Sequence, residues 1–268
     1  MKKTGNSFFY IGGAISGVLL LLILVGYVWT PYDPAAMDSA VKFAAPSLSH
    51  LLGTDNFGRD IFSRVVQGAD MSFLIALCVV AISCLCGVII GSLCGYYGGI
   101  PDLILTRVCD SITAFPAILL ALVVLSITGN GVVNIILVLG ILFIPSFARI
   151  VRGEFARCRE LNYIKSARLM GAGDFRIMFF HILPNTFPVL LPAVTIGFNN
   201  AILSEASMSF LGIGVPPTQP SLGAMLNDSQ TYLRSAPWYA LGTGAAIILL
   251  ILGFSMLNEG LQRSSQGG

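Results

Sequence analysis

Long runs of apolar residues constrain this chain more than any other feature of its sequence. A helix that crosses bilayer hydrocarbon needs about 20 predominantly apolar residues. Lipid allows only helices and closed barrels, and these runs lack the alternation of barrel strands, so the sequence predicts an all-α integral membrane protein. The six transmembrane helices expected are residues 8–29, 72–94, 111–128, 131–151, 186–210 and 239–257.

Composition supports this class of protein. Of the 268 residues, 55% are apolar and 10% are charged, whereas a soluble domain carries about 25% charged residues. The first apolar run is longer than the core of a cleaved signal peptide, so we expect an uncleaved span. The six cysteines lie in or beside spans or in a cytosolic segment, which indicates packing residues rather than a disulfide framework.

The basic residues predict the orientation of the chain, because cytoplasmic segments are enriched in Lys and Arg. With the N-terminus inside, eleven basic residues face the cytoplasm and four face outward. Both termini and the segment 152–185 are therefore expected in the cytoplasm. The inner set is Lys2, Lys3, Arg107, Arg149, Arg152, Arg157, Arg159, Lys165, Arg168, Arg176 and Arg263, and the outer set is Lys42, Arg59, Arg64 and Arg234.

Four parts are expected along the chain. Residues 1–30 hold the cytoplasmic N-terminus and first span, and residues 31–70 form an external loop. Residues 71–260 form the core, including a cytoplasmic hairpin at 153–185, and residues 261–268 form a polar tail. The chain has no G-x-x-x-x-G-K-[ST] phosphate loop, so we expect it not to hydrolyse a nucleotide by itself.

Glycine and proline predict how the spans pack and bend. Pro116 and Pro145 are expected to kink the third and fourth spans, which the short turn 128–131 joins as an antiparallel hairpin. Glycines four residues apart lie on one helix face and favour close packing against another helix of the same chain. These glycines are Gly87, Gly91, Gly95 and Gly99.

The segment "YIKSARLMGAGDFRIMFFHILPN" (163–185) is basic and has the pattern helix, turn, helix. A helix over 160–170 ends at Gly171 as its cap, and Asp174 is expected to cap a second helix that stops at Pro184. Apolar side chains around the turn favour docking into a partner, whereas a lipid-surface helix explains only the charge. These side chains are Leu169, Met170, Phe175, Met178 and Phe179.

Ala167, Gly171, Leu183 and Pro184 form a pattern that resembles the EAA loop of permease subunits in ATP-binding-cassette importers. Other stretches are similar to the C-type permease subunits of dipeptide, oligopeptide and nickel importers, and the resemblance covers about residues 31–260. These stretches are "LGTDNFGRDIFSRVVQGA" (52–69), "FPAILLAL" (115–122), "SFLGIGVPPTQPSLGAML" (209–226) and "APW" (236–238).

This resemblance implies type I ABC-importer architecture and a non-catalytic subunit of the bacterial or archaeal cytoplasmic membrane. Its implied partners are a second homologous permease subunit, two cytosolic ATPase subunits that bind ATP and Mg, and an external substrate-binding protein. The chain would bind no cofactor and no metal, and would form half of a pathway for di- or oligopeptides. Nickel, a metal chelate or glutathione remain alternative substrates.

The hairpin corresponds to the coupling helix of that family, which sits in a groove of the ATPase. The chain departs from the usual Glu-Ala-Ala with Lys165-Ser166-Ala167, which reverses one charge. Asp70 replaces a frequent arginine, and Leu222 replaces a common tryptophan. The expected coupling residues are Lys165, Ser166, Ala167, Gly171, Ala172, Gly173, Asp174, Leu183 and Pro184.

Two further sites are expected. In the external segments 31–70 and 214–236, charged residues are candidates for docking the binding protein. The alternative is that they only stabilise the loop by local hydrogen bonds, because exposed charges often contribute little. These residues are Asp55, Arg59 and Asp60.

In the fifth span, one helix face is a candidate pathway wall, the alternative being that it packs against the third span. That face carries Ala201, Glu205 and Met208.

Other classes of function fit the sequence less well. Glu205 inside a span is a candidate functional group for a secondary transporter or channel, with a structural hydrogen bond as the alternative. The chain has no inverted repeat and no relay of charges, which argues against ion coupling. His50 and His181 lie outside the spans, so neither shares a span with Glu205 and no intramembrane enzyme is indicated.

Overall fold

The computed structural model describes residues 2–216 and 219–265. Every regular element in these two ranges is helical, and Thr54 and Asp60 form one isolated antiparallel bridge. The elements are α1 (Lys2–Val28), η1 (Ser39–Val41), α2 (Ile61–Tyr97), α3 (Gly99–Thr113), α4 (Ala117–Thr128), α5 (Val132–Cys158), α6 (Asn162–Leu169), α7 (Asp174–Arg176), η2 (Ile177–Ile182), α8 (Leu183–Phe210), α9 (Leu222–Gln230) and α10 (Pro237–Ser265).

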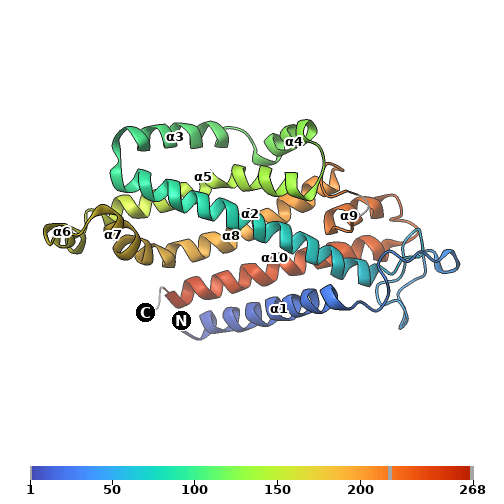
Figure 1. The fold of residues 1–268 in the computed structure, drawn as a ribbon. Helices are drawn as coiled ribbons and strands as arrows, with labels where there is room; N and C mark the ends of the chain where they lie inside the picture. Colours follow the sequence, from blue (N-terminus) through green and yellow to red (C-terminus); the bar gives the residue numbers. More distant parts are fainter. Residues whose placement is uncertain (1, 217–218, 266–268) are drawn as a thin grey trace.

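The long helices run side by side in a bundle (Figure 1). The beginning of α1 and the end of α10 lie at the same end of the bundle as α6 and α7. The segment between α1 and α2 lies at the opposite end, together with α9. This arrangement agrees with the expected topology, in which both termini and the hairpin share one side of the membrane.

Four helices of the described residues are long and apolar enough to cross a membrane, and five if a bent pair counts as one span. The four are Ile61–Tyr97, Val132–Cys158, Asp174–Phe210 and Pro237–Gly260. The first expected span is represented by α1, whose apolar stretch Gly12–Val28 is shorter than any of these four helices.

The third expected span differs most from its prediction. Residues 111–128 do not form one kinked helix, because α3 and α4 meet at an angle of 83°. Pro116 is the N-cap of α4, and its ψ of 122° lies outside the helical region. Proline also disfavours a helical conformation in the residue before it, and α3 ends at Thr113 with Ala114 as its C-cap. By contrast, α5 continues through Pro145 as a single helix.

The glycine spacing in α2 is explained by its contact with α5. An added Cβ at Gly87 would lie 2.5 Å from the Phe147 Cβ, and one at Gly91 would lie 2.5 Å from the Ala148 carbonyl oxygen. Packing against a helix of the same chain is therefore confirmed for these positions and for Gly95. The fourth glycine, Gly99, is different, because it lies beyond α2 and has φ of +66°. A Cβ added at Gly99 would have no atom within 4 Å.

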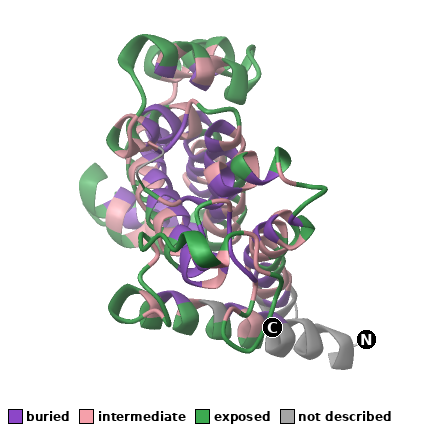
Figure 2. Ribbon diagram, turned by 90° about the vertical axis from the view of Figure 1, so that its right-hand side faces the viewer, coloured by how far each residue is buried: buried purple, intermediate pink, exposed green. Residues whose placement is uncertain are grey.

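Two apolar cores hold the bundle together. The larger core joins α2, α5 and α8 with the π-helical segment η2, and the smaller core joins α1, α2, α9 and α10. Figure 2 shows buried residues where helices face one another and exposed residues on the outer surfaces. Since α2 and α8 contribute to the site described below, the larger core fixes its geometry.

Candidate functional site

The turn of the hairpin is built from backbone hydrogen bonds around Gly171. The Ala172 N–H donates to the Ala167 carbonyl at 3.0 Å, and the Gly171 N–H donates to the Arg168 carbonyl at 3.0 Å. This pair of bonds is a Schellman motif, which needs a residue with positive φ after the helix. Gly171 has φ of +84°, so its predicted role as the cap of α6 is confirmed.

The second arm differs from its prediction in two ways. Gly173 rather than Asp174 caps α7, and the Asp174 carboxylate instead accepts a hydrogen bond from Tyr96 on α2. The arm also does not stop at Pro184, because η2 continues directly into α8. In η2 the Leu183 N–H donates to the Met178 carbonyl, five residues back. This wider turn directly precedes Pro184, which has no N–H to donate.

The tip of the hairpin presents apolar side chains to its surroundings. Leu169 is 89% exposed, Met170 82% and Phe175 70%. The remaining two predicted tip residues belong to the interior: Met178 is buried, and Phe179 packs partly against the larger core. An exposed apolar tip at the end of a membrane protein indicates a contact with another protein or with lipid.

The hairpin is fixed to the bundle by both apolar and polar contacts. Ile164 and Ala167 on α6 are buried, and Ile177 on η2 belongs to the larger core. The Arg168 guanidinium donates to the Tyr96 hydroxyl at 2.9 Å. That hydrogen bond raises the pKa of Arg168 above its ordinary value.

Lys165, Ser166 and Ala167, which stand in place of the usual Glu-Ala-Ala, lie on α6. Lys165 and Ser166 are exposed on α6, and Ala167 faces the interior. The Lys165 ammonium lies 3.9 Å from the Glu160 carboxylate, and both side chains are more than half exposed. An exposed pair of this kind contributes little to stability, so Lys165 remains available to a partner. Leu183 is half-buried and Pro184 exposed at the base of the second arm.

The three predicted pathway residues on α8 are all fully buried in this chain: Ala201, Glu205 and Met208 each have 0% exposure. The Glu205 carboxylate accepts hydrogen bonds from the Ser72 hydroxyl on α2 at 2.7 Å and from the Ser209 hydroxyl at 2.8 Å. This face therefore packs inward, as the structural alternative expected. At Glu205, however, the contact is with Ser72 of α2 rather than with the third span.

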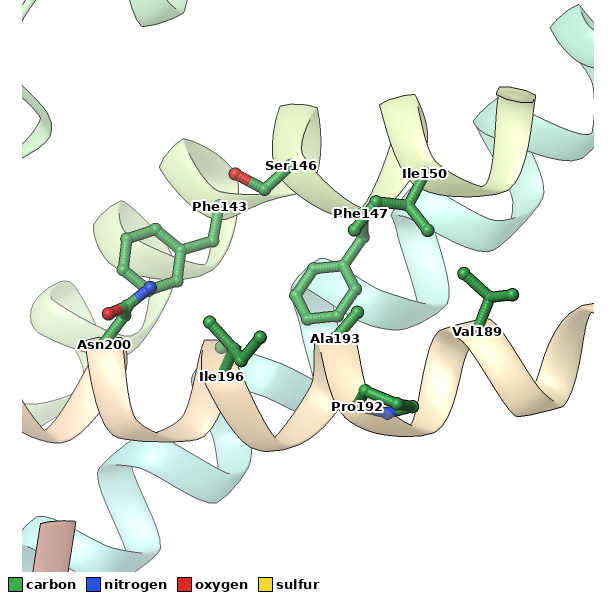
Figure 3. A pocket seen from close by; sticks show the side chains of 10 residues that line it. Phe143, Ser146, Phe147, Ile150, Val189, Pro192, Ala193, Ile196 and Asn200 are labelled. Atoms are coloured by element: carbon green, nitrogen blue, oxygen red, sulfur yellow. The ribbon is translucent and has the colours of Figure 1, made fainter. Parts of the chain in front are cut away.

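A different face of α8 borders open space. Between α5 and α8 lies a cavity of about 380 Å³ (Figure 3). Its lining is apolar and aromatic apart from Ser146 and Asn200. The lining residues are Phe143, Ser146, Phe147, Ile150, Val189, Pro192, Ala193, Ile196, Gly197 and Asn200.

One feature of the sequence indicates this face, namely the Asn199-Asn200 pair inside an apolar run. The sequence alone does not show which of the two asparagine side chains faces a neighbouring helix and which faces open space. In the structure, the Asn199 amide donates to the Ser255 hydroxyl on α10 at 2.8 Å. Asn200 is exposed and lines the cavity instead.

The charges predicted to dock a binding protein are mostly used within the external segment. Asp55 is fully buried, accepts from the Arg59 side chain at 2.6 Å, and also accepts from the Phe57 and Arg59 N–H groups. Asp60 is also buried, caps α2 through the Ser63 N–H, and lies 2.9 Å from His50. Local stabilisation of the loop accounts for both carboxylates.

No group of three or more His, Cys, Asp or Glu side chains in the described part of the chain is placed to hold a metal ion. The described residues offer three features that can serve a function. These are the apolar tip of the hairpin, the uncharged cavity between α5 and α8, and the folded external segment.

Comparison with known proteins gives the family. Residues 87–265 match the family described as binding-protein-dependent transport system inner membrane component. The chain is 36% identical over 262 residues to the dipeptide transport system permease protein DppC of Alkalihalophilus pseudofirmus, covering 98% of this chain and 86% of the relative. It is 39% identical over 252 residues to the glutathione transport system permease protein GsiD of Pectobacterium atrosepticum, covering 92% and 84%.

A solved structure supports the fold. The chain is similar to a chain of the MetNI methionine ABC transporter in inward-facing conformations, with a TM-score of 0.62 and 18% identity. That match covers 75% of this chain and 95% of the other. The sequence resemblance to importer permeases is thereby confirmed: the chain belongs to the family of inner membrane components of binding-protein-dependent transport systems, as a permease subunit of an ABC importer.

Proposed function

We propose that this chain forms half of a translocation pathway for short peptides and does no covalent chemistry itself. The observation that carries this proposal is the hairpin, whose apolar tip projects at the end of the bundle that holds both termini. Two cytosolic ATPase subunits, which bind ATP and Mg, would dock on this tip, and a second homologous permease chain would complete the pathway.

Docking on the ATPase would use the exposed tip. Leu169 and Met170 would enter an apolar groove, while Lys165 would meet an acidic residue on the rim of that groove. Gly171, Ala172 and Gly173 would shape the turn, and the remaining coupling residues, Ser166, Ala167, Asp174, Leu183 and Pro184, would hold the arms in place. Conformational change in the ATPases would then move the hairpin as a rigid body.

The cavity between α5 and α8 is the better candidate for the pathway wall. Ala201, Glu205 and Met208 are enclosed in this conformation, whereas Ile196 and Asn200 on α8 border open space. An apolar wall with few polar groups would contact varied side chains without holding any of them tightly. We therefore propose that the pathway wall is the face of α8 that carries Ile196 and Asn200, rather than the buried face that carries Glu205.

The external segment would receive the substrate-binding protein through its exposed side chains. Leu48 is 100% exposed and Leu51 54%, and both lie between α1 and α2. Asp55 and Asp60 would support this surface from beneath, because their hydrogen bonds fix the loop. The proposed docking surface thus keeps the segment 31–70 and shifts the contact from its charges to its apolar residues.

The substrate class rests on relatives that transport peptides by name, a dipeptide permease and a glutathione permease. Both substrates are short peptides, and nickel or a metal chelate remain the alternatives. Identification of what the external binding protein retains on purification tests this choice. A dipeptide or glutathione supports it, and a metal ion or metal chelate overturns it.

The proposed docking is tested by co-purification of the ATPase subunits. The double variant Leu169→Gln/Met170→Gln removes apolar surface at the tip without adding charge. Since each exposed side chain that becomes buried contributes about 1.5–3 kcal/mol, we expect at least a tenfold loss of co-purified ATPase. Leu161→Gln is the matched control, because Leu161 is 41% exposed at the other end of α6. Equal recovery with the tip variant would refute docking there.

A further inference from the structure

The cytosolic end of α2 meets both arms of the hairpin at a single side chain. Tyr96 is the second-to-last residue of α2 and is 5% exposed. Its hydroxyl donates to the Asp174 carboxylate on α7 at 2.6 Å. The same hydroxyl oxygen accepts from the Arg168 guanidinium on α6 at 2.9 Å. One oxygen atom therefore joins the arms before and after the Gly171 turn.

Both bonds involve a charged partner, which makes them stronger than bonds between neutral groups. The Arg168 guanidinium carbon also lies 5.6 Å from the centroid of the Tyr96 ring. Rotation of either arm about the turn would lengthen one of these contacts, because the two partners approach from different helices. The network therefore fixes the orientation of the hairpin as well as its position.

The end of α2 is itself fastened to α5. The Arg159 guanidinium, just after α5, donates to the Gly95 carbonyl at 3.3 Å and to the Tyr96 carbonyl at 3.2 Å. Further along the bundle, α2 and α5 pack closely through Gly87 and Gly91. Because Tyr96 holds the hairpin, a displacement of the hairpin would act on the closely packed α2–α5 pair. Of these two helices, α5 borders the cavity.

We propose that Tyr96 is a positioning residue that locks both arms of the hairpin to the α2–α5 pair, so that movement of the hairpin is transmitted to the cavity wall. This inference rests on the proposed function of the hairpin. The tip that would bind the ATPase, Leu169 and Met170, is separate from the lock. Loosening the lock should therefore leave the ATPase bound and disconnect its hydrolysis from transport.

The test uses the complete complex in proteoliposomes with its external binding protein. Tyr96→Phe keeps the buried ring and removes only the hydroxyl. Loss of a hydrogen bond to a charged partner changes an equilibrium by about tenfold or more, so we expect substrate transported per ATP hydrolysed to fall by about fivefold or more. ATPase co-purification and the ATPase rate without binding protein should stay at the wild-type level.

Tyr97→Phe is the matched control, because Tyr97 is the adjacent residue and is 57% exposed. It should transport with the wild-type ratio. Asp174→Asn should lower the ratio as Tyr96→Phe does, and the double variant should be no worse than the stronger single variant, since both remove the same interaction.

The outcomes separate the lock from the proposed function. A wild-type ratio in Tyr96→Phe overturns the lock and leaves ATPase docking on the tip intact. A smaller amount of assembled complex with an unchanged ratio also overturns it, because Tyr96 would then only stabilise the fold. ATPase that fails to bind the wild-type chain would instead refute the proposed function.

Discussion

Glu205 shows how a single buried residue organises this structure. Its two carboxylate oxygens accept from Ser72 and Ser209, and the Ser209 hydroxyl oxygen in turn accepts from the Val215 N–H at 3.2 Å. Glu205 thus connects α2 to α8 and to the loop that follows α8. A buried carboxylate requires such partners, because an unpaired charge in an apolar interior is very costly.

The variants Glu205→Ala and Glu205→Gln test this connecting role. Alanine leaves two buried serine hydroxyls without their acceptor, so we expect a loss of about 1–3 kcal/mol in stability. Glutamine retains one acceptor oxygen and should lose less. Thermal unfolding of the detergent-solubilised chain measures both effects. Wild-type stability of Glu205→Ala, accompanied by loss of transport, would instead indicate a role in the pathway.

The proposed pathway wall is also tested at the level of one residue. Ile196→Trp places a large ring in the cavity between α5 and α8, and we expect it to reduce transport by about tenfold or more, because a filled cavity leaves no room for substrate. Leu191→Trp is the matched control: Leu191 lies on the same helix and is 50% exposed, against 49% for Ile196, but it does not line the cavity. Similar transport by both variants would place the pathway elsewhere.

Among the elements, the contact between α2 and α5 depends most on small residues. An added Cβ at Gly91 would lie 2.5 Å from the Ala148 carbonyl oxygen and 3.0 Å from the Val151 Cβ. Two helix backbones can approach so closely only where a side chain is missing. The contact matters for function because α5 carries one wall of the cavity and α2 carries the end of the proposed lock.

Gly91→Ala should therefore separate the two helices, at a cost of about 1–3 kcal/mol for overpacking. Gly153→Ala is its control, since Gly153 lies within α5 and a Cβ there would contact nothing within 4 Å. That change should be neutral or stabilise α5 by about 0.5–1 kcal/mol. Thermal unfolding of both variants in detergent provides the comparison, and equal effects would mean that the contact tolerates a side chain.

Elements with a strong local signal could be predicted from the sequence. The apolar runs gave the main helices, and the four-residue spacing of Gly87, Gly91 and Gly95 gave a packing face. The effects of Pro116 and Pro184 are harder to predict, because proline has two different outcomes here. Pro116 lies at the break between α3 and α4, whereas Pro184 follows a π-helical segment that continues into α8. Which of these outcomes occurs depends on tertiary packing around each proline, which the local sequence does not show.

For the whole molecule, the main test of orientation is cysteine labelling of a Cys-free chain in intact cells. Ala40→Cys and Ser235→Cys should react with an impermeant reagent from outside, because both residues are exposed. The segments that hold them, between α1 and α2 and between α9 and α10, lie at the end opposite the hairpin. Arg176→Cys should react only after the membrane is opened. External labelling at 176 would reverse the topology.

The candidate sites depend on contacts between distant parts of the chain, which limits their prediction. The Gly171 turn is local and was correctly predicted. Tyr96 lies 72 residues from Arg168 and 78 from Asp174 along the chain, so no spacing rule brings them together. For the same reason the sequence did not show that Glu205 faces Ser72 and that the exposed face of α8 lies elsewhere.

The measurement that tests the function of the whole molecule most directly is uptake of a labelled dipeptide by proteoliposomes. These vesicles contain this chain with the proposed second permease and the two proposed ATPase subunits, and the external binding protein is added. We expect accumulation only when ATP is present on the ATPase side, and none with Leu169→Gln/Met170→Gln, which should leave the ATPases unattached. Accumulation without ATP, driven by an ion gradient alone, would contradict the assignment of this chain to an ATP-driven importer.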